Sequence, residues 1–183
     1  MNKTTAHVLC LLLLASALPL FATGDAYASL NAYPVPIMTN VCINEFMADP
    51  DWDWDQDGTF NSAKDEWIEL YNPNGYSVSM KGWNVTDPVK RYSLSGKTIG
   101  AYGHMVLFGN ASKISLNNGG DTIYLYNDTD TLVDTFQYYS SRNNISTGRL
   151  PDGGDKWTSF YEPTINGSNG LWPDIVINEV LID

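Results

Sequence analysis

Short segments in which apolar and polar residues alternate recur from residue 41 to about residue 165, and clusters of Gly, Asn, Asp and Pro separate them. A period of two is typical of β-strands that bury one face, and no window sustains the 3.6-residue period of a helix. The alternation predicts strands over residues 66–72, 82–87, 91–94, 105–109, 122–127 and 132–139. About seven short strands at this spacing favour an all-β fold, an antiparallel β-sandwich.

Two of these segments also indicate their place in a sheet. In residues 66–72, Ile68 and Leu70 share one face, which predicts a half-buried strand. Residues 105–108 are apolar on both faces, which predicts a central strand.

The first 28 residues have the layout of a secretory signal peptide. Lys3 precedes a 15-residue apolar stretch, and Ala26 and Ala28 form a small-x-small cleavage site. The apolar stretch is too short, and too soon interrupted by Pro19, for a membrane span, although an uncleaved N-terminal anchor is the alternative. We therefore expect a secreted or cell-surface protein of 155 residues (183 minus 28) that starts with an extended leader over residues 29–40.

Charge and cysteine content narrow the classes of partner and of stabilising bond. Removal of the signal takes away Lys3 and Asp25, which leaves 9 basic and 20 acidic residues and a net charge of −11. Such an acidic surface repels phosphate backbones, which argues against nucleic acid as a partner. Cys10 leaves with the signal, so Cys42 remains alone, and we expect it to be a small buried hydrophobic residue rather than a reactive thiol.

Five Asn-x-Ser/Thr triplets are candidate N-glycosylation sites, which predicts that their asparagines lie in surface loops or at strand ends. These asparagines are Asn84, Asn110, Asn127, Asn144 and Asn166.

The most acidic part of the chain lies between residues 49 and 72, where eight acidic residues accompany one lysine, and a bound divalent cation would offset their repulsion. The sequence Asp53-x-Asp55-x-Asp57-Gly58 matches the start of an EF-hand calcium loop, in which alternate side chains turn oxygens inward and glycine permits the bend. The twelfth position is Lys64 instead of the usual glutamate, so the next two acids are the residues available to close the shell. The predicted Ca²⁺ ligands are Asp53, Asp55, Asp57, Thr59 (carbonyl), Asn61 (side chain or water), Asp65 and Glu66; the alternative is an ion-free, solvated acidic loop.

Trp52 and Trp54 alternate with these aspartates, so their indoles face away from a bound ion. As an exposed pair they would stack on a sugar or on another protein. Alternatively, the two rings cover the edge of the sandwich, because aromatic side chains usually bury. The sequence leaves both interpretations open.

Catalytic groups are sparse. His104 is the only histidine after signal removal, and its place beside a glycine at the entrance of a strand predicts a turn residue rather than a general base. Glu66 and Glu69 stand three residues apart in a strand, so their carboxylates diverge, unlike the acid and base of a glycosidase. Glu45 and Asp134 lie in apolar segments, where we expect structural hydrogen bonds to loop amides. We therefore expect no enzymatic activity.

Seven motifs in sequence order carry a resemblance to a known family: residues 43–50, 65–72, 82–87, 106–110, 120–126, 132–135 and 148–153. Together they make residues 41–165 similar to the lamin tail domains of secreted prokaryotic proteins. The resemblance implies an immunoglobulin-like β-sandwich with no defining catalytic activity. Nuclear lamins use this domain for protein and DNA contacts, but this acidic chain lacks the rod segment and the basic surface that those uses need.

Residues 175–183 nearly repeat residues 41–49, since both contain Ile-Asn-Glu followed by an acidic residue in register. This predicts a linker over residues 166–174 and then the first strand of an incomplete second lamin tail domain. An unpaired strand of this kind favours self-pairing with another copy of the chain.

These expectations combine into a non-enzymatic, calcium-stabilised extracellular module for protein attachment, adhesion or spacing, whose partner is a surface protein or glycan. One alternative is a calcium-dependent carbohydrate-binding module. Another is an accessory domain or fragment of a larger extracellular hydrolase or nuclease.

Overall fold

The alternating segments form strands in the computed structural model, which describes residues 40–170. Every strand predicted from the alternation is present, with ends within two residues of the predicted ones. The elements of this part of the chain are β1 (Cys42–Met47), β2 (Trp67–Tyr71), β3 (Val78–Ser79), β4 (Asn84–Thr86), β5 (Arg91–Ser93), β6 (Thr98–Ile99), β7 (His104–Phe108), α1 (Gly109–Ser112), β8 (Asp121–Tyr126), β9 (Leu132–Tyr138), β10 (Ser146–Arg149) and β11 (Trp157–Phe160).

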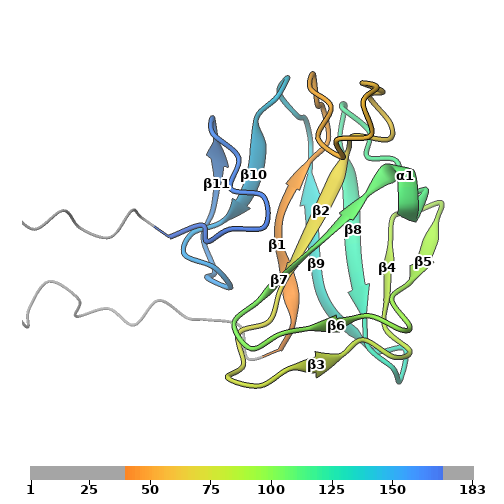
Figure 1. Ribbon diagram of the computed structural model, residues 1–183, viewed down its shortest axis with the longest axis vertical. Coiled ribbons are helices and arrows are strands. Elements are labelled where there is room, and N and C mark those ends of the chain that lie inside the picture. The colour runs from red at the N-terminus through yellow and green to blue at the C-terminus, as the bar shows by residue number, and fades with distance from the viewer. Residues whose placement is uncertain (1–39, 171–183) are drawn as a thin grey trace, which may run out of the picture. The chain divides into compact units, whose positions relative to one another are not determined.

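The strands form two main antiparallel sheets. One has the order β11-β10-β1-β2-β7 and the other the order β5-β4-β8-β9, while β3 and β6 form a separate pair. Figure 1 shows the two sheets as layers, with the β3–β6 pair at one end of the sandwich and α1 near the other. The all-β, immunoglobulin-like sandwich that the sequence predicts is confirmed.

The hydrophobic core lies between these layers. The five-stranded sheet contributes the buried side chains of Ile43, Ile68 and Leu70, and the four-stranded sheet contributes those of Ile123 and Leu125. In β2 and β8 these residues alternate with ones that point away from the core, as the period of two requires. In β1 the irregularity between Ile43 and Glu45 breaks the alternation, and the next core residue of the strand is Phe46.

Strand β2 is buried on both faces, so the prediction of a half-buried strand is wrong. Ile68 and Leu70 face the core, but Trp67 and Glu69 on the opposite face are also inaccessible, with exposed fractions of 1% and 0%. The cause is a cover supplied from distant parts of the chain. The backbone N–H of Asn166, for example, lies over β2 and donates a hydrogen bond to Oε2 of Glu69 at 2.6 Å.

Strand β7 lies at the edge of its sheet, so the prediction of a central strand is also wrong. Leu107 is in the core and Met105 packs against it, whereas Val106 and Phe108 are only partly buried on the outer face. Strand β7 has a neighbouring strand on one side only. It is apolar on both faces because residues outside the sheet partly cover its outer face as well.

Strands β10 and β11 were not predicted, because their sequences lack an apolar alternation. Close packing explains the position of β10 instead. A Cβ on Gly148 would lie 2.9 Å from the carbonyl oxygen of Asn44, so only glycine lets β10 approach β1 this closely.

A buried ion pair joins the two sheets. Asp134 on β9 accepts a hydrogen bond from the backbone N–H of Ile43 at 2.8 Å, next to the irregularity in the β1–β2 pairing. Nη2 of Arg149 on β10 lies 2.9 and 3.0 Å from the two carboxylate oxygens of Asp134, and its Nε donates to the carbonyl of Ile43 at 2.8 Å. The predicted structural role of Asp134 is therefore correct, although its partners are a strand amide and a guanidinium rather than loop amides.

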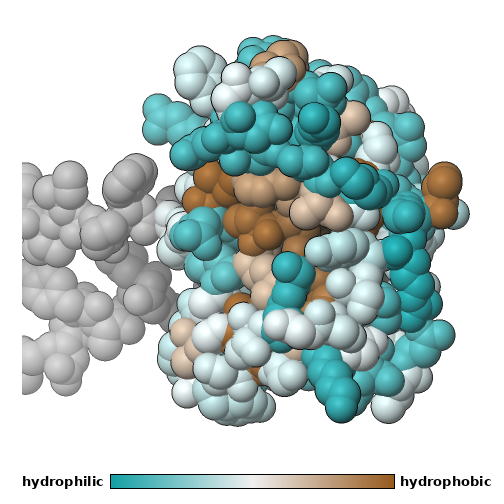
Figure 2. Space-filling view, turned by 45° about the vertical axis from the view of Figure 1, so that its right-hand side comes forward, coloured by the Kyte–Doolittle hydropathy of each residue, from teal (hydrophilic) through white to brown (hydrophobic). Residues whose placement is uncertain are grey.

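Hydrophobic residues also reach the surface of this part of the chain. Figure 2 shows a face on which they gather in one patch, with hydrophilic residues above it and at its margins.

Residues 40–170 contain no helix with the length and apolar character that a membrane crossing requires. The predicted signal peptide (1–28), nearly all of the leader (29–40) and the predicted second strand (175–183) lie outside the described residues.

Candidate functional site

The acidic loop, residues 49–66, connects β1 to β2 and brings three predicted metal ligands together. One carboxylate oxygen from each of Asp53, Asp55 and Asp57 lies within 4.8 Å of the others. Asp53 and Asp55 are partly exposed and Asp57 is exposed, so an ion could reach the cluster from solvent. Oxygen-only donors of this kind are the ligands that Ca²⁺ prefers.

Hydrogen bonds from the backbone shape this cluster. The carboxylate of Asp53 accepts the N–H groups of Asp57 at 3.1 Å and Gly58 at 2.8 Å, and Asp57 in turn accepts the N–H of Thr59 at 2.9 Å. Gly58 has a φ of 90°, a conformation that glycine adopts without strain. The glycine at the sixth position of the motif therefore serves the bend for which the sequence motif predicts it.

Two other predicted ligands, Asp65 and Asn61, bind the backbone of the loop itself, whereas the predicted donor of Thr59 is its carbonyl. Asp65 is fully buried, and its two carboxylate oxygens accept the N–H of Asp55 at 3.1 Å and of Asn61 at 2.7 Å. The side-chain oxygen of Asn61 accepts the N–H of Lys64 at 3.1 Å and so caps a turn. Thr59 is exposed, and its N–H is engaged with Asp57.

Glu66 points away from the three aspartates, although the sequence analysis placed it among the ligands. Its Oε2 accepts the N–H of Leu116 at 2.7 Å, across 50 residues of sequence. Burial raises the pKa of Glu66 to about 7, although hydrogen bonds from Leu116 and Ser115 oppose that shift. Glu66 therefore ties β2 to the loop before β8 and does not close the metal shell.

The two loop tryptophans differ. Trp54 is partly buried, its ring meets that of Trp67 edge-on at 6.1 Å between centroids, and its Nε1 donates to Oδ1 of Asn144 at 3.1 Å. Trp52 is 67% exposed. Of the two interpretations that the sequence left open, the covering role applies to Trp54, and only Trp52 is free to stack on a ligand.

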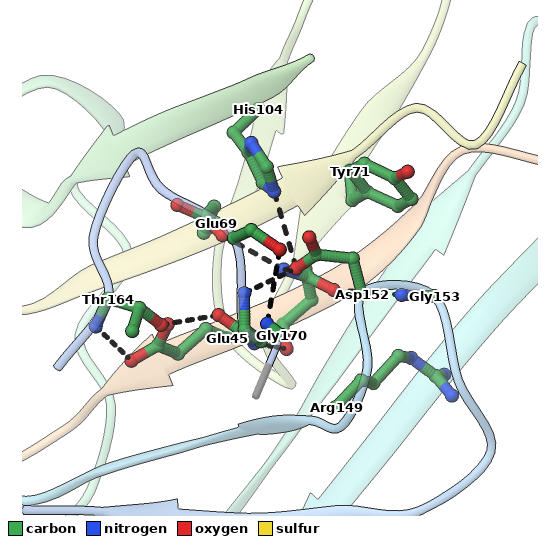
Figure 3. Close-up of polar contacts among 12 residues, drawn as sticks. Glu45, Glu69, Tyr71, His104, Arg149, Asp152, Gly153, Thr164 and Gly170 are labelled. Atoms are coloured by element: carbon green, nitrogen blue, oxygen red, sulfur yellow. Dashed lines mark hydrogen bonds and ion pairs between the residues drawn. The ribbon is translucent and has the colours of Figure 1, made fainter. Parts of the chain in front are cut away.

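A second polar cluster lies on the outer face of the five-stranded sheet, beneath residues 161–170, here named the C-terminal strap (Figure 3). Glu45 accepts hydrogen bonds from the N–H of Thr164 at 3.2 Å and from its hydroxyl at 2.5 Å. Glu69 accepts the strap N–H of Asn166, and Oδ1 of Asp152 accepts that of Asn169 at 2.9 Å. Three carboxylates therefore each hold one backbone N–H of the strap. For Glu45, this is the loop-amide bonding that the sequence predicts.

The titration of this cluster follows from its burial. Burial raises the pKa of Glu69 to about 7, although a hydrogen bond from Asn44 and the charge of His104 oppose it. Burial also raises the pKa of Glu45, against hydrogen bonds from Ser146 and Thr164. The carboxylates of this face, which are the groups that could act as acids or bases, therefore bind the backbone of the strap.

His104 begins β7 and faces this cluster, so it is a strand residue rather than the predicted turn residue. Its Nε2 lies 3.4 Å from Oδ1 of Asp152, an ion-pair distance without the geometry of a hydrogen bond. Burial lowers the pKa of His104, but Asp152 and Glu69 outweigh it and raise the pKa above its usual value. For Asp152, burial is outweighed by His104 and the strap, which hold the pKa at about 2.

Comparison with known proteins fits this architecture. The sequence profile of the Lamin Tail Domain family matches residues 36–140, more than half of the chain. The chain belongs to the lamin tail domain family. No curated protein matches the sequence significantly. The match is to one copy of the lamin tail domain and ends before β10, β11 and the strap, which nevertheless complete the five-stranded sheet and cover it.

Cys42 of this lamin tail domain is fully buried on β1, as the sequence predicts. Burial raises the pKa of its thiol to about 12, so the reactive thiolate is scarce at neutral pH. Four of the five triplet asparagines lie at strand ends or in connecting segments: Asn84 begins β4, Asn127 follows β8, Asn144 lies in the β9–β10 turn and Asn166 in the strap. Asn110 lies instead in the short helix α1.

Proposed function

We propose that this lamin tail domain acts outside the cell, secreted or on the cell surface, as a non-enzymatic module for protein attachment, adhesion or spacing, and that Ca²⁺ stiffens its acidic loop. The observation that carries the proposal is the approach of three carboxylate oxygens to within 4.8 Å at an accessible loop. Extracellular calcium is abundant enough to occupy weak sites of this type, whose dissociation constants are roughly 10⁻⁴–10⁻³ M.

The ligand set fits a weak calcium site. Asp53, Asp55 and Asp57 would supply carboxylate oxygens and Thr59 its carbonyl, in the order that an EF-hand-type loop uses. The closing carboxylate is missing, because Lys64 occupies its position, Asp65 is fully buried beneath the loop amides that it binds, and Glu66 binds the amide of Leu116 outside the loop. We therefore expect an affinity at the weak end of the calcium-binding range.

The non-enzymatic part of the proposal draws support from the second polar cluster. Glu45, Glu69 and Asp152 are the acids whose charges act on His104, the single histidine of the described residues, and each accepts a backbone N–H from the strap. Groups covered and occupied in this way lack access to a polymer substrate. The acidic composition also disfavours nucleic acid, which leaves a surface protein or a glycan as partner, with self-pairing through residues 175–183 as an additional mode.

Calcium removal tests the proposal. Isothermal titration of EDTA-treated protein with CaCl₂ should give binding heat, and 5 mM Ca²⁺ should stabilise the fold by about 1–2 kcal/mol if the dissociation constant is about 0.5 mM. Asp57→Asn should abolish most of both effects, and Asp51→Asn, an exposed acid of the same loop outside the cluster, should retain them. Absence of heat and of thermal stabilisation in the unaltered protein would overturn the calcium site.

A further inference from the structure

A groove of about 640 Å³ lies between the acidic loop, the outer face of the edge strand β7 and the C-terminal strap. Its volume falls in the range of sites for small molecules and short oligomers. Four segments that are distant in sequence build its walls, because the β9–β10 turn adds Asn144 to the other three, so no single sequence motif predicts the groove. The lining residues are Trp52, Asp53, Trp54, Asp55, Gln56, Val106, Phe108, Asn144, Ile165 and Asn166.

The walls of the groove are fixed before any ligand arrives. The indole of Trp54 is held by Oδ1 of Asn144 and by its edge-on contact with Trp67. The backbone N–H of Asn144 donates to the carbonyl of Asp49 at 2.7 Å, and that of Asn166 donates to Glu69. A wall that is already ordered loses little conformational entropy on binding.

The carboxylates of the groove are already engaged. Both oxygens of Asp53 accept backbone N–H groups, and Oδ1 and Oδ2 of Asp55 accept from Asp57 at 3.0 Å and from Nδ2 of Asn110 at 3.2 Å. Together with the Ca²⁺ of the proposed function, these contacts use the oxygens of both carboxylates, so a cationic organic ligand would find neither of them free to pair. An anionic ligand is disfavoured by the net charge of −11.

The groups that remain available are neutral. Within residues 40–170 the side chains of Gln56 and Asn166 and Nδ2 of Asn144 make no hydrogen bond, so each can donate to a ligand. Trp52, 67% exposed, and Phe108, partly exposed, offer aromatic faces beside these amides. A ligand that matches this lining has apolar C–H faces and hydroxyl edges and no charge, which is the chemistry of a neutral sugar.

We propose that this groove binds a neutral saccharide chain, with Trp52 as the stacking surface and the amides of Gln56, Asn144 and Asn166 as hydroxyl partners. The inference rests on the proposed extracellular binding role and names the ligand class of that role. The stacking function that the sequence analysis left open for both tryptophans falls to Trp52 alone, because Trp54 forms a fixed wall.

The test uses the full chain from a host that does not N-glycosylate Asn144 or Asn166, in buffer with calcium. A glycan array of neutral, sialylated and sulfated chains is followed by titration calorimetry with the best neutral oligosaccharide on the array. Trp52→Ala should weaken its binding about tenfold or more. Tyr76→Ala removes an aromatic ring of equal exposure (66%) outside the groove and should bind as the unaltered protein does.

A second variant removes an amide rather than a ring. Asn166→Gly keeps the positive φ of 58° and the backbone N–H that Glu69 accepts, and it should weaken saccharide binding severalfold with an unchanged melting temperature.

Three results would overturn the proposal: no binding to any neutral glycan on the array, a preference for charged glycans, or equal affinity in the Trp52→Ala variant. Calcium-dependent stabilisation measured on the same sample separates the two hypotheses. If calcium stabilises the protein while neutral glycans do not bind, only the saccharide groove is wrong. If neutral glycans bind through Trp52 without calcium-dependent stabilisation, only the metal site is wrong.

Discussion

The buried carboxylate of Glu69 should make this lamin tail domain less stable as the pH rises from 4.5 to 7.5. Its pKa is raised in the folded protein from 4.5 to about 7, and its side chain has no solvent exposure. A group with a raised folded pKa binds a proton more tightly in the native state than in the unfolded state. Its contribution to stability is therefore complete below pH 4.5 and is lost as the pH passes through about 7.

The size of the effect follows from the same values. A pKa raised from 4.5 to about 7 corresponds to a loss of about 3 kcal/mol, at about 1.4 kcal/mol per pH unit between the two values. Glu66 has a pKa of about 7 as well and contributes with the same sign. The raised pKa values of Glu45 and His104 act in the same direction, while the stabilisation from Asp152 is lost only as the pH falls toward 2.

The perturbation is Glu69→Gln, which removes the titrating proton and keeps one of the two acceptor oxygens. Urea unfolding, followed by tryptophan fluorescence at half-unit intervals from pH 4.5 to 7.5, gives the free energy of unfolding at each pH. The variant should be about 1 kcal/mol less stable than the unaltered protein at pH 4.5, because one acceptor is lost. Between pH 4.5 and pH 7.5 the variant should lose about 3 kcal/mol less stability than the unaltered protein, so the two curves of unfolding free energy against pH should cross.

Glu162→Gln is the matched control, since Glu162 is an exposed glutamate of the same strap and its replacement should leave the curve parallel to that of the unaltered protein. Parallel curves for Glu69→Gln would refute the reasoning, because they would show that Glu69 titrates in the folded state as it does in the unfolded chain.

Two further predictions concern packing and are measured by urea unfolding at pH 7. Asp134→Ala should destabilise the domain by about 3–5 kcal/mol, because it leaves Arg149 as an unpaired buried charge. Arg91→Gln, which breaks an exposed ion pair, should destabilise it by less than about 1 kcal/mol. Equal losses in these two variants would contradict the buried tie between the sheets. Gly109→Ala places a Cβ against the carbonyl oxygen of Ala63, which has no room for it, and should lower the free energy of unfolding by about 3 kcal/mol. In the control Gly119→Ala the new Cβ meets no atom within 4 Å, so the stability should hardly change. An unchanged stability in Gly109→Ala would contradict the close approach of the acidic loop to α1.

The sequence could predict the strands whose burial differs between two faces, because that difference is recorded as an alternation. Strand β8, with its pattern of Ile123 and Leu125 between polar and aromatic neighbours, is such a case. Strand β10 is not, because Ser146, Gly148 and Arg149 are all buried by contacts with β1 and β9 rather than by their own hydrophobicity. The partners on β1 are more than 100 residues away in sequence.

The candidate metal site likewise has one part that the sequence predicts and another that depends on long-range contacts. The spacing of Asp53, Asp55 and Asp57 is local, and the structure brings their oxygens together as the motif predicts. Glu66 belongs to the same loop as these aspartates, but its partner is the amide of Leu116 in another loop, and no local sequence pattern predicts that contact. The groove is harder still to foresee, because Phe108, Asn144 and Ile165 meet only in the folded sandwich.

The strap also bears on where this lamin tail domain ends as a folding unit. The family match stops at residue 140, but β10 pairs directly with β1, and Arg149 satisfies Asp134 within the matched segment. Without the residues beyond 140, Asp134 between the sheets would lose the guanidinium that pairs with it, and Glu45 and Glu69 on the outer face would lose both their cover and the strap N–H groups that they bind. A buried acid without its partner costs several kcal/mol, a large share of the stability of a domain of this size. The unit that folds therefore extends beyond the family match at least to Arg149, and the strap that follows covers the outer face of the same sheet as far as Asn169, whose N–H reaches Asp152.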